Sequence, residues 1–238
     1  MQSRIHLALL LSMCSIACTG AQAQQSLHAQ VDLIRSGHRV KDTSNAVVWL
    51  TPVGTRFDPP RQDPAHIPQL VQKNKSFRPS LLIIPAGGKV EFPNHDPFFH
   101  NVFSLFEGKR FDLGLYESGT TRFVQFDKPG ISFIFCNIHA QMTAVVIAVA
   151  TPYYAISNAR GELSLPDVPP GRYALQIFQP SVPPDSLRQL SREITISPGQ
   201  TSLGTFKLVE SGVEVAHKNK YGRDYDPPDP DSPAYARP

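Results

Sequence analysis

Residues 131–150 read ISFIFCNIHAQMTAVVIAVA, and this stretch decides the fold. Residues 131–135 are mostly β-branched or aromatic, and they follow the turn signal DKPG at 127–130. Residues 143–150 form an apolar run that is typical of a buried strand. The stretch therefore predicts two strands joined by the tight loop 136–142.

The loop carries a thiol, an imidazole and a thioether in the pattern C-x-x-H-x-x-M, from Cys136, His139 and Met142. Sulfur ligands combined with imidazole favour copper over magnesium, calcium or manganese. Two histidines and one cysteine with a distant axial methionine are the ligands of blue copper sites. The alternative is a chance occurrence of these residues around one histidine. A blue copper site also needs a second histidine from elsewhere in the chain.

Residues 90–102, VEFPNHDPFFHNV, offer two histidines for that position, His95 and His100. His95 lies in a segment rich in Asn, Asp and Pro, which is typical of a solvated turn. His100 directly precedes Asn101 and Val102. Both histidines are candidates on the residues alone.

The segment from about Gln72 to Ala150 resembles the cupredoxins, which are small blue copper proteins of the plastocyanin and amicyanin kind. Four landmarks carry the resemblance: F-x-P at 77–79, PAGGKVEFPN at 85–94, HNV at 100–102, and the C-x-x-H-x-x-M loop. The resemblance implies a Greek-key β-sandwich over residues 67–150 that holds one type 1 copper ion. The ligands that it implies are His100, Cys136, His139 and Met142, with Asn101 bracing the ligand loop by hydrogen bonds.

The ligand loop departs from the family at two positions. Blue copper loops commonly carry proline beside the loop histidine, whereas this chain has Ile138 and Ala140. We therefore expect a less rigid loop.

The first 23 residues have the pattern of a secretory signal peptide. Arg4 gives a positive start, Leu7 to Cys18 form a short apolar core, and AQA at 21–23 is a small-residue cleavage site. We expect the mature chain to begin at Gln24 and to be exported to the periplasm. The alternative is a lipoprotein that is acylated at Cys18. The mature chain then keeps one cysteine and one methionine, and both lie in the ligand loop.

A second module is expected around the pattern G-x-x-x-L-x-x-x-P-P-G-x-Y, which runs from Gly161 to Tyr173. This pattern resembles the carboxypeptidase regulatory-like, transthyretin-type β-sandwich, which is usually noncatalytic. Because its usual first hairpin is missing before the pattern, we expect residues 26–56 to complete it. The cupredoxin would then be inserted into a discontinuous domain of 26–56 and 151–210. The alternative is that these strands extend the cupredoxin.

The composition supports an all-β protein with these two sandwiches. The 238 residues are 41% apolar and include 23 prolines, which disfavours long helices. A net charge of +3 without basic clusters gives no footprint for nucleic acid, and no long apolar stretch after the leader predicts a transmembrane segment. Residues 211–238 are rich in proline and charge and are expected to be disordered.

The expected function is single-electron transfer between periplasmic redox partners, without enzymatic activity. The resemblance places partner docking near the exposed edge of His139. An apolar patch there would be formed by Pro97, Phe98, Phe99, Ile138 and Ala140. The remaining mature histidines are expected to be structural or solvated: His28, His38, His66, His95 and His217.

Three alternatives remain at this point. A copper-binding or delivery protein could use the same ligands. A carbohydrate-binding sandwich with an accessory copper site could bind glycan through Tyr153, Tyr154 or Tyr173. A copper enzyme of the nitrite reductase kind would need further histidines between domains, and the chain has few at suitable positions. Chains with this pairing of modules resemble proteins labelled methylamine utilization proteins, a label that does not identify an electron donor.

Overall fold

The computed structural model describes residues 25–54, 58–105, 108–211 and 217–225. Within these ranges the secondary structure is almost entirely β, with one short helix, α1 (Pro184–Leu190). The predicted all-β class is confirmed. No helix in the described ranges is long and apolar enough to cross a membrane.

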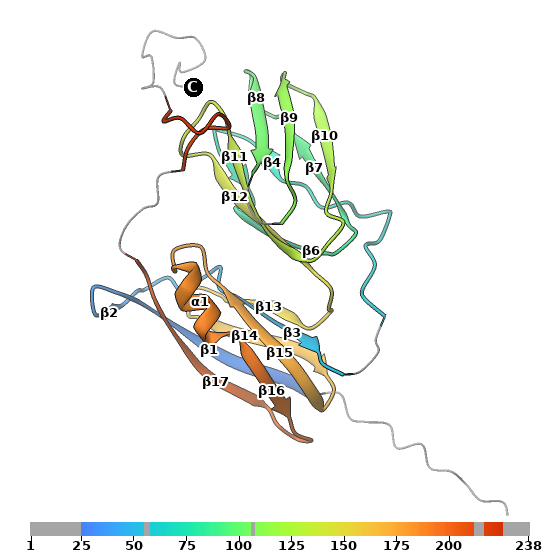
Figure 1. Ribbon diagram of the computed structural model, residues 1–238, viewed down its shortest axis with the longest axis vertical. Coiled ribbons are helices and arrows are strands. Elements are labelled where there is room, and N and C mark those ends of the chain that lie inside the picture. Colours follow the sequence, from blue (N-terminus) through green and yellow to red (C-terminus); the bar gives the residue numbers. More distant parts are fainter. Residues whose placement is uncertain (1–24, 55–57, 106–107, 212–216, 226–238) are drawn as a thin grey trace, which may run out of the picture.

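The upper half of the molecule in Figure 1 is a β-sandwich built around one five-stranded sheet. The order of that sheet is β6-β12-β11-β8-β9, with β6 and β12 parallel and the other pairs antiparallel. Its strands are β6 (Leu81–Pro85), β8 (His100–Ser104), β9 (Phe111–Tyr116), β11 (Gly130–Cys136) and β12 (Thr143–Val149). The smaller elements are β7 (Lys89–Pro93) paired with β10 (Thr121–Gln125), and the hairpin of β4 (Val71–Gln72) and β5 (Phe77–Arg78).

Strand β12 is buried on both faces. Its residues Ala144, Val146 and Ala148 belong to the core of the upper sandwich, together with Phe92 and Ile134. The intervening residues Val145, Ile147 and Val149 belong to the buried cluster of the lower half. Because strand side chains alternate between faces, both halves of the molecule pack against this strand. The continuous apolar run in the sequence is explained by this double burial.

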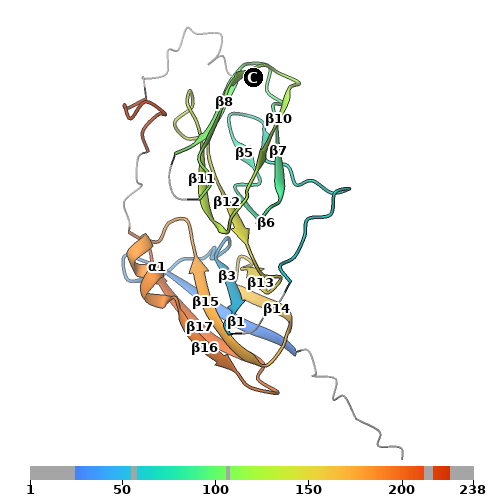
Figure 2. The ribbon, with the colours of Figure 1, turned by 45° about the vertical axis from the view of Figure 1, so that its right-hand side comes forward.

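The lower half is a second sandwich of two sheets, visible below the first in Figure 2. One sheet has the order β14-β1-β17, with β2 on β1, and the other has the order β13-β3-β15-β16. The first sheet contains β1 (Gln25–Arg35), β2 (His38–Arg39), β14 (Glu162–Val168) and β17 (Ser202–Val209). The second contains β3 (Val47–Pro52), β13 (Tyr154–Ile156), β15 (Gly171–Phe178) and β16 (Arg192–Ile196).

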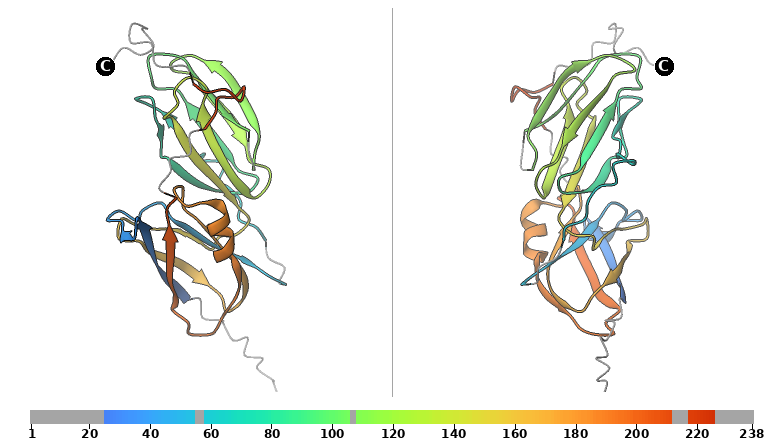
Figure 3. Two further views of the ribbon diagram at one scale, coloured as in Figure 1. Left: turned by 60° about the vertical axis from the view of Figure 1, so that its left-hand side comes forward. Right: turned by 90° about the vertical axis from the view of Figure 1, so that its right-hand side faces the viewer.

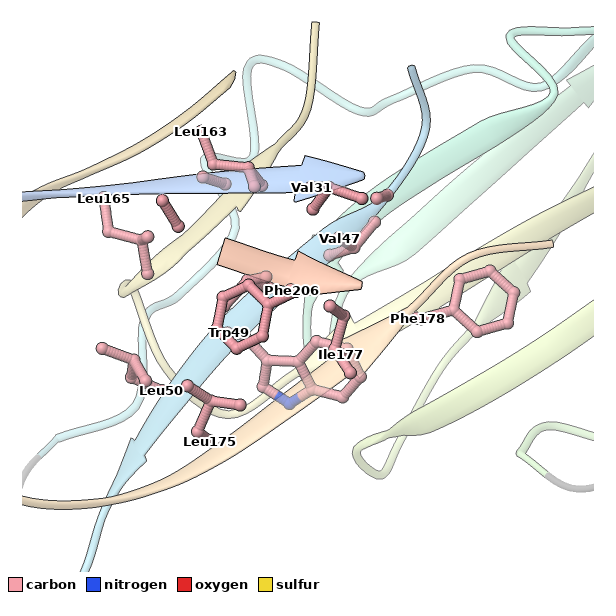
Figure 4. Packing of buried hydrophobic residues seen from close by; sticks show 14 of the residues in the cluster. Val31, Val47, Trp49, Leu50, Leu163, Leu165, Leu175, Ile177, Phe178 and Phe206 are labelled. Atoms are coloured by element: carbon pink, nitrogen blue, oxygen red, sulfur yellow. The ribbon is translucent and has the colours of Figure 1, made fainter. Parts of the chain in front are cut away.

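Strands from both ends of the chain alternate in these two sheets. Strand β1 lies between β14 and the parallel strand β17, and β3 lies between β13 and β15. Figure 4 shows Trp49, Ile177 and Phe206 packed together between the sheets. The chain leaves this sandwich after β3 and returns to it after β12.

Two expectations concern the ends of the chain. The predicted signal peptide and the alternative at Cys18 lie outside the described residues. Residues 217–225 belong to the segment 211–238 for which disorder is expected, and they contact the loop 136–142 at the far end of the upper sandwich, in dark red in Figure 3. Hydrogen bonds and ring stacking hold residues 217–225 in place, and such contacts leave no periodic apolar pattern in the sequence.

Candidate metal centre

The ligand residues predicted from the sequence lie where β8 and β11 meet. His100 is the first residue of β8 and Cys136 is the last residue of β11. Cys136 pairs with Val102, so the antiparallel register brings His100 beside the loop that follows β11. The loop closes on itself, because the Cys136 amide donates to Met142 O at 3.1 Å and the Met142 amide donates to His139 O at 3.0 Å.

Three potential ligand atoms converge in this corner. The Cys136 Sγ lies 3.7 Å from His100 Nδ1 and 3.6 Å from His139 Nδ1. The possible ligand atoms of the three residues all lie within 4.8 Å of one another. Two atoms that each lie about 2.0–2.3 Å from one ion, at an angle of about 120°, are about 3.7 Å apart. The two sulfur-to-nitrogen distances therefore fit a common metal ion.

The cluster is shielded from water. Cys136 and His100 are fully buried, and His139 is 5% exposed. The ring of Phe98 lies against both imidazoles, with centroids 5.2 Å from His100 and 5.7 Å from His139. Met142 is fully buried in the same core as Cys136. Such burial excludes water from the positions around a bound ion.

Asp96 is a site residue that sequence analysis missed. Its buried carboxylate accepts a hydrogen bond from His100 Nε2 at 2.8 Å. With the proton on Nε2, the Nδ1 lone pair of His100 faces the sulfur of Cys136, which is the tautomer that a metal ligand needs. Burial lowers the pKa of His100 despite the opposing effect of Asp96, so the imidazole is neutral. The motif Asp-x-x-x-His at 96–100 is the signal that could have identified this pair.

Asp96 also holds a tight turn from another part of the chain. The turn between β4 and β5 places Asn74 and Lys75 at φ angles of 54° and 52°. Two successive residues with positive φ are typical of a type I′ hairpin turn and are unfavourable for residues other than Gly, Asn and Asp. The backbone amides of Asn74 and Lys75 donate to Asp96 at 2.6 and 3.0 Å. Although burial opposes it, the hydrogen bonds from His100 and these amides hold the pKa of Asp96 below its ordinary value.

The other two groups are uncharged without a metal. Burial raises the pKa of Cys136, although the backbone amides of Asn101, Ile138 and His139 partly oppose this effect by hydrogen bonding to the sulfur. Burial, together with the positive charge of His100 when protonated and of Lys75, lowers the pKa of His139 to about 4. At neutral pH the metal-free cluster is therefore a thiol and two neutral imidazoles. Binding of a metal to the thiolate would release a proton.

The side chain of Asn101 is linked to the ligand loop only indirectly. Its side-chain amide donates to Asp112 Oδ1 on β9 at 2.7 Å. Asp112 Oδ2 accepts from Lys220 Nζ at 2.8 Å, and the Lys220 amide donates to the side chain of Asn137 in the loop at 2.9 Å. The connection from the Asn101 side chain to the side chain of Asn137 thus passes through two further residues, Asp112 and Lys220.

The expected docking patch is only partly exposed. Phe99 is 51% exposed, Pro97 and Ala140 are exposed, and Phe98 and Ile138 are half-buried. The expected exposed edge of His139 differs from the structure, in which that side chain is 5% exposed. The apolar surface nearest to the cluster is therefore contributed mainly by Phe99.

The remaining candidate residues lie away from the cluster or in its surroundings. His95 is exposed. His217 stacks on Phe135 with a centroid distance of 4.1 Å. Tyr173 is 4% exposed, donates its hydroxyl to Pro169 O and packs edge-on against Tyr153, so its ring is not available to stack on a sugar.

No protein-family model and no curated protein matches this chain. Among solved structures, a purple cupredoxin from Nitrosopumilus maritimus is 23% identical with a TM-score of 0.32, and the match covers 34% of this chain and 99% of that one. An amicyanin from Paracoccus versutus is 22% identical with a TM-score of 0.33, covering 37% and 85%. A copper-containing nitrite reductase from Thermus scotoductus is 22% identical with a TM-score of 0.34, covering 49% of this chain and 28% of that one.

Proposed function

We propose that this chain is a blue copper protein that carries single electrons. The observation that carries the proposal is the buried convergence of Cys136 Sγ with the Nδ1 atoms of His100 and His139. A thiolate and two imidazoles select copper by their softness, and Met142 at the end of the loop is proposed as the axial ligand. Copper bound there would supply one electron by cycling between Cu(I) and Cu(II).

The protein's own residues support that role by holding the ligands still. Asp96 fixes the tautomer of His100, and the backbone amides of Asn101, Ile138 and His139 surround the sulfur of Cys136. Three protein ligands held by the fold before metal binding keep reorganisation small when the charge of the ion changes. The three clustered residues are at most 5% exposed, so a substrate would not reach them, and we propose no enzymatic activity.

The burial of the site counts against a role in copper delivery. Transfer of copper to another protein requires that a ligand of the acceptor reach the ion. Each of the three clustered residues is at most 5% exposed, so an acceptor would have to displace the loop or Phe98 first. Electron transfer needs only close approach, and Phe99 beside the site offers an apolar surface for brief docking of a redox partner.

We further propose that the leader directs the protein to the periplasm and that the cupredoxin of residues 67–150 is inserted into the sandwich of 26–56 and 151–210. The alternation of β1 and β3 with strands of residues 154–209 supports the second point. The short distance in sequence between Val149 at the end of β12 and Tyr154 at the start of β13 agrees with a direct return of the chain.

The test is copper titration of the purified metal-free protein. One equivalent of Cu(II) should produce an intense visible absorption from the Cys136 thiolate and the narrow copper hyperfine splitting of a blue site in electron paramagnetic resonance. His100→Ala should abolish both signals, and the exposed neighbour substitution His95→Ala should keep both. Binding of copper without the visible band, or its rapid loss during redox cycling, would instead support delivery.

A further inference from the structure

Residues 217–225 lie across the ligand loop. We call this segment the C-terminal strap. Figures 1 and 2 both place it beside the end of β11 and the start of β12, at the opposite end of the molecule from the lower sandwich. The strap contributes no residue to either hydrophobic core among the described residues. Packing into a hydrophobic core therefore does not explain why the strap lies beside the ligand loop.

The strap bonds to the loop at three successive places. The Tyr225 hydroxyl donates to Cys136 O at 2.8 Å, and the Lys220 amide donates to Asn137 Oδ1 at 2.9 Å. His217 Nε2 donates to Ala140 O at 2.7 Å. Burial raises the pKa of Tyr225, so its hydroxyl stays protonated and able to donate. The strap thus donates one hydrogen bond to each of three acceptors in the loop: Cys136 O, Asn137 Oδ1 and Ala140 O.

The strap is itself fixed to the upper sandwich. The His217 ring stacks on Phe135 of β11, with centroids 4.1 Å apart and planes 28° apart, and the ring of Tyr225 packs edge-on against it. Lys220 Nζ forms an ion pair with Asp112 of β9 at 2.8 Å. Between these anchors, Asn219 closes a turn by accepting hydrogen bonds from the amides of Tyr221 and Arg223. The strap is therefore a compact, folded segment with its own attachment points.

We propose that the C-terminal strap positions the ligand loop, and that Tyr225, Lys220 and His217 are its positioning residues. The loop has Ile138 and Ala140 beside His139, so proline does not restrict its backbone. The strap supplies that restriction from outside by holding Cys136, Asn137 and Ala140. On the inner side of the same loop, the amides of Ile138 and His139 bond to the sulfur of Cys136. When the strap holds the outer side of the loop, the amides of Ile138 and His139 stay within hydrogen-bonding distance of the Cys136 sulfur.

The first test measures the loop in the metal-free protein, so it does not depend on copper. Hydrogen exchange of the amides in residues 137–142 is compared between a chain ending at residue 216 and one ending at residue 225. Loss of one net hydrogen bond is expected to speed exchange about fivefold, and loss of the whole strap by at least about a hundredfold. Tyr225→Phe should give the smaller effect, while Arg223→Lys, at an exposed position of the same strap, should give none.

The second test asks whether positioning reaches the metal, and this part rests on the proposed function. In the copper-loaded protein, Tyr225→Phe and the chain ending at 216 should change the intensity ratio of the visible bands and speed copper release to a chelator. The urea midpoint of the metal-free chain should stay unchanged, because the strap adds nothing to the cores. If the shortened chain does not fold, the variants Tyr225→Phe and Lys220→Met decide whether the strap affects the metal site.

The outcomes separate the two proposals. If the loop amides of the chain ending at residue 216 exchange within twofold of those of the chain ending at residue 225, the positioning role is overturned, whatever the metal does. A full-length chain that binds no copper overturns the proposed function, and the exchange experiment still decides the role of the strap. If loop exchange becomes faster while the visible bands stay unchanged, the strap protects the loop but does not influence the metal. That result overturns the second part of the proposal.

Discussion

Replacement of Asp96 by alanine tests how the candidate site is held together. The carboxylate accepts hydrogen bonds from His100 Nε2 and from the backbone amides of Asn74 and Lys75. It therefore joins a candidate ligand, His100 at the start of β8, to a strained turn between β4 and β5. Asp96→Ala removes all three acceptor contacts and leaves the donors in place.

The expected loss of stability follows from the burial of those donors. A buried donor left without a partner costs about 1–3 kcal/mol. His100 is fully buried and is expected to bear the full cost, whereas the turn amides are only partly buried and can be reached by water. We therefore expect Asp96→Ala to lower the free energy of unfolding by about 3 kcal/mol. Asp96→Asn keeps one acceptor oxygen and should lose less.

The assay is urea unfolding of the metal-free protein at pH 7, followed by far-UV circular dichroism. The matched control is His95→Ala, because His95 is adjacent in sequence and exposed, and a change within about 0.5 kcal/mol is expected there. In the copper-loaded variant, His100 is free to rotate, so copper should also be released faster. If Asp96→Ala unfolds within 1 kcal/mol of the parent protein, the carboxylate does not hold the turn and the histidine together.

The remaining predictions concern the ligands and pH. Cys136→Ser should abolish the visible band and leave a folded β protein, which circular dichroism would show, and an unchanged band would contradict the assigned site. Met142→Leu should keep copper and colour but raise the reduction potential, whereas His139→Ala should lose the band or regain it with added imidazole; loss of all copper in Met142→Leu would exclude an axial role. The pKa of His139 is about 4 in the fold and about 6.5 in an unfolded chain, so the unfolded state binds more protons between these values. Metal-free stability should therefore fall by up to about 3 kcal/mol as pH drops from about 6.5 to about 4, and His139→Gln should flatten that part of the curve.

The strand pattern was predictable because it depends on local sequence. The strands expected around the ligand loop are β11 and β12, and the pattern ending in Pro-Pro-Gly gives β14 and β15 with Gly171 at the start of the second strand. The burial of Val145, Ile147 and Val149 against the lower sandwich was not predictable. An apolar run shows that both faces of a strand are covered, but it carries no information on which part of the chain covers each face.

The three clustered candidate ligands could be named from the sequence for a chemical reason, and their surroundings could not. A cysteine, two histidines and a methionine in this spacing are informative because sulfur and imidazole have few other joint uses. Asp96 has a weaker signature, because two of its three donors are the backbone amides of Asn74 and Lys75, which any residue could supply. Only the spacing Asp-x-x-x-His points to the third donor, His100. Lys220 and Tyr225 were assigned to a disordered tail because a segment bound by polar contacts shows no apolar periodicity.

The position of the loop between two rigid strands explains why both Asp96 and the strap are needed. Cys136 and Met142 at its ends are fully buried, and β12 is packed on both faces, so these ends are held by the cores. The freedom that remains lies in residues 137–141, which carry His139, and in the rotation of the His100 ring. The strap restricts the first through Asn137 and Ala140, and Asp96 restricts the second. Because these restraints share no residue, we expect the effects of Asp96→Ala and Tyr225→Phe on the activation free energy of copper release to be additive within about 0.5 kcal/mol.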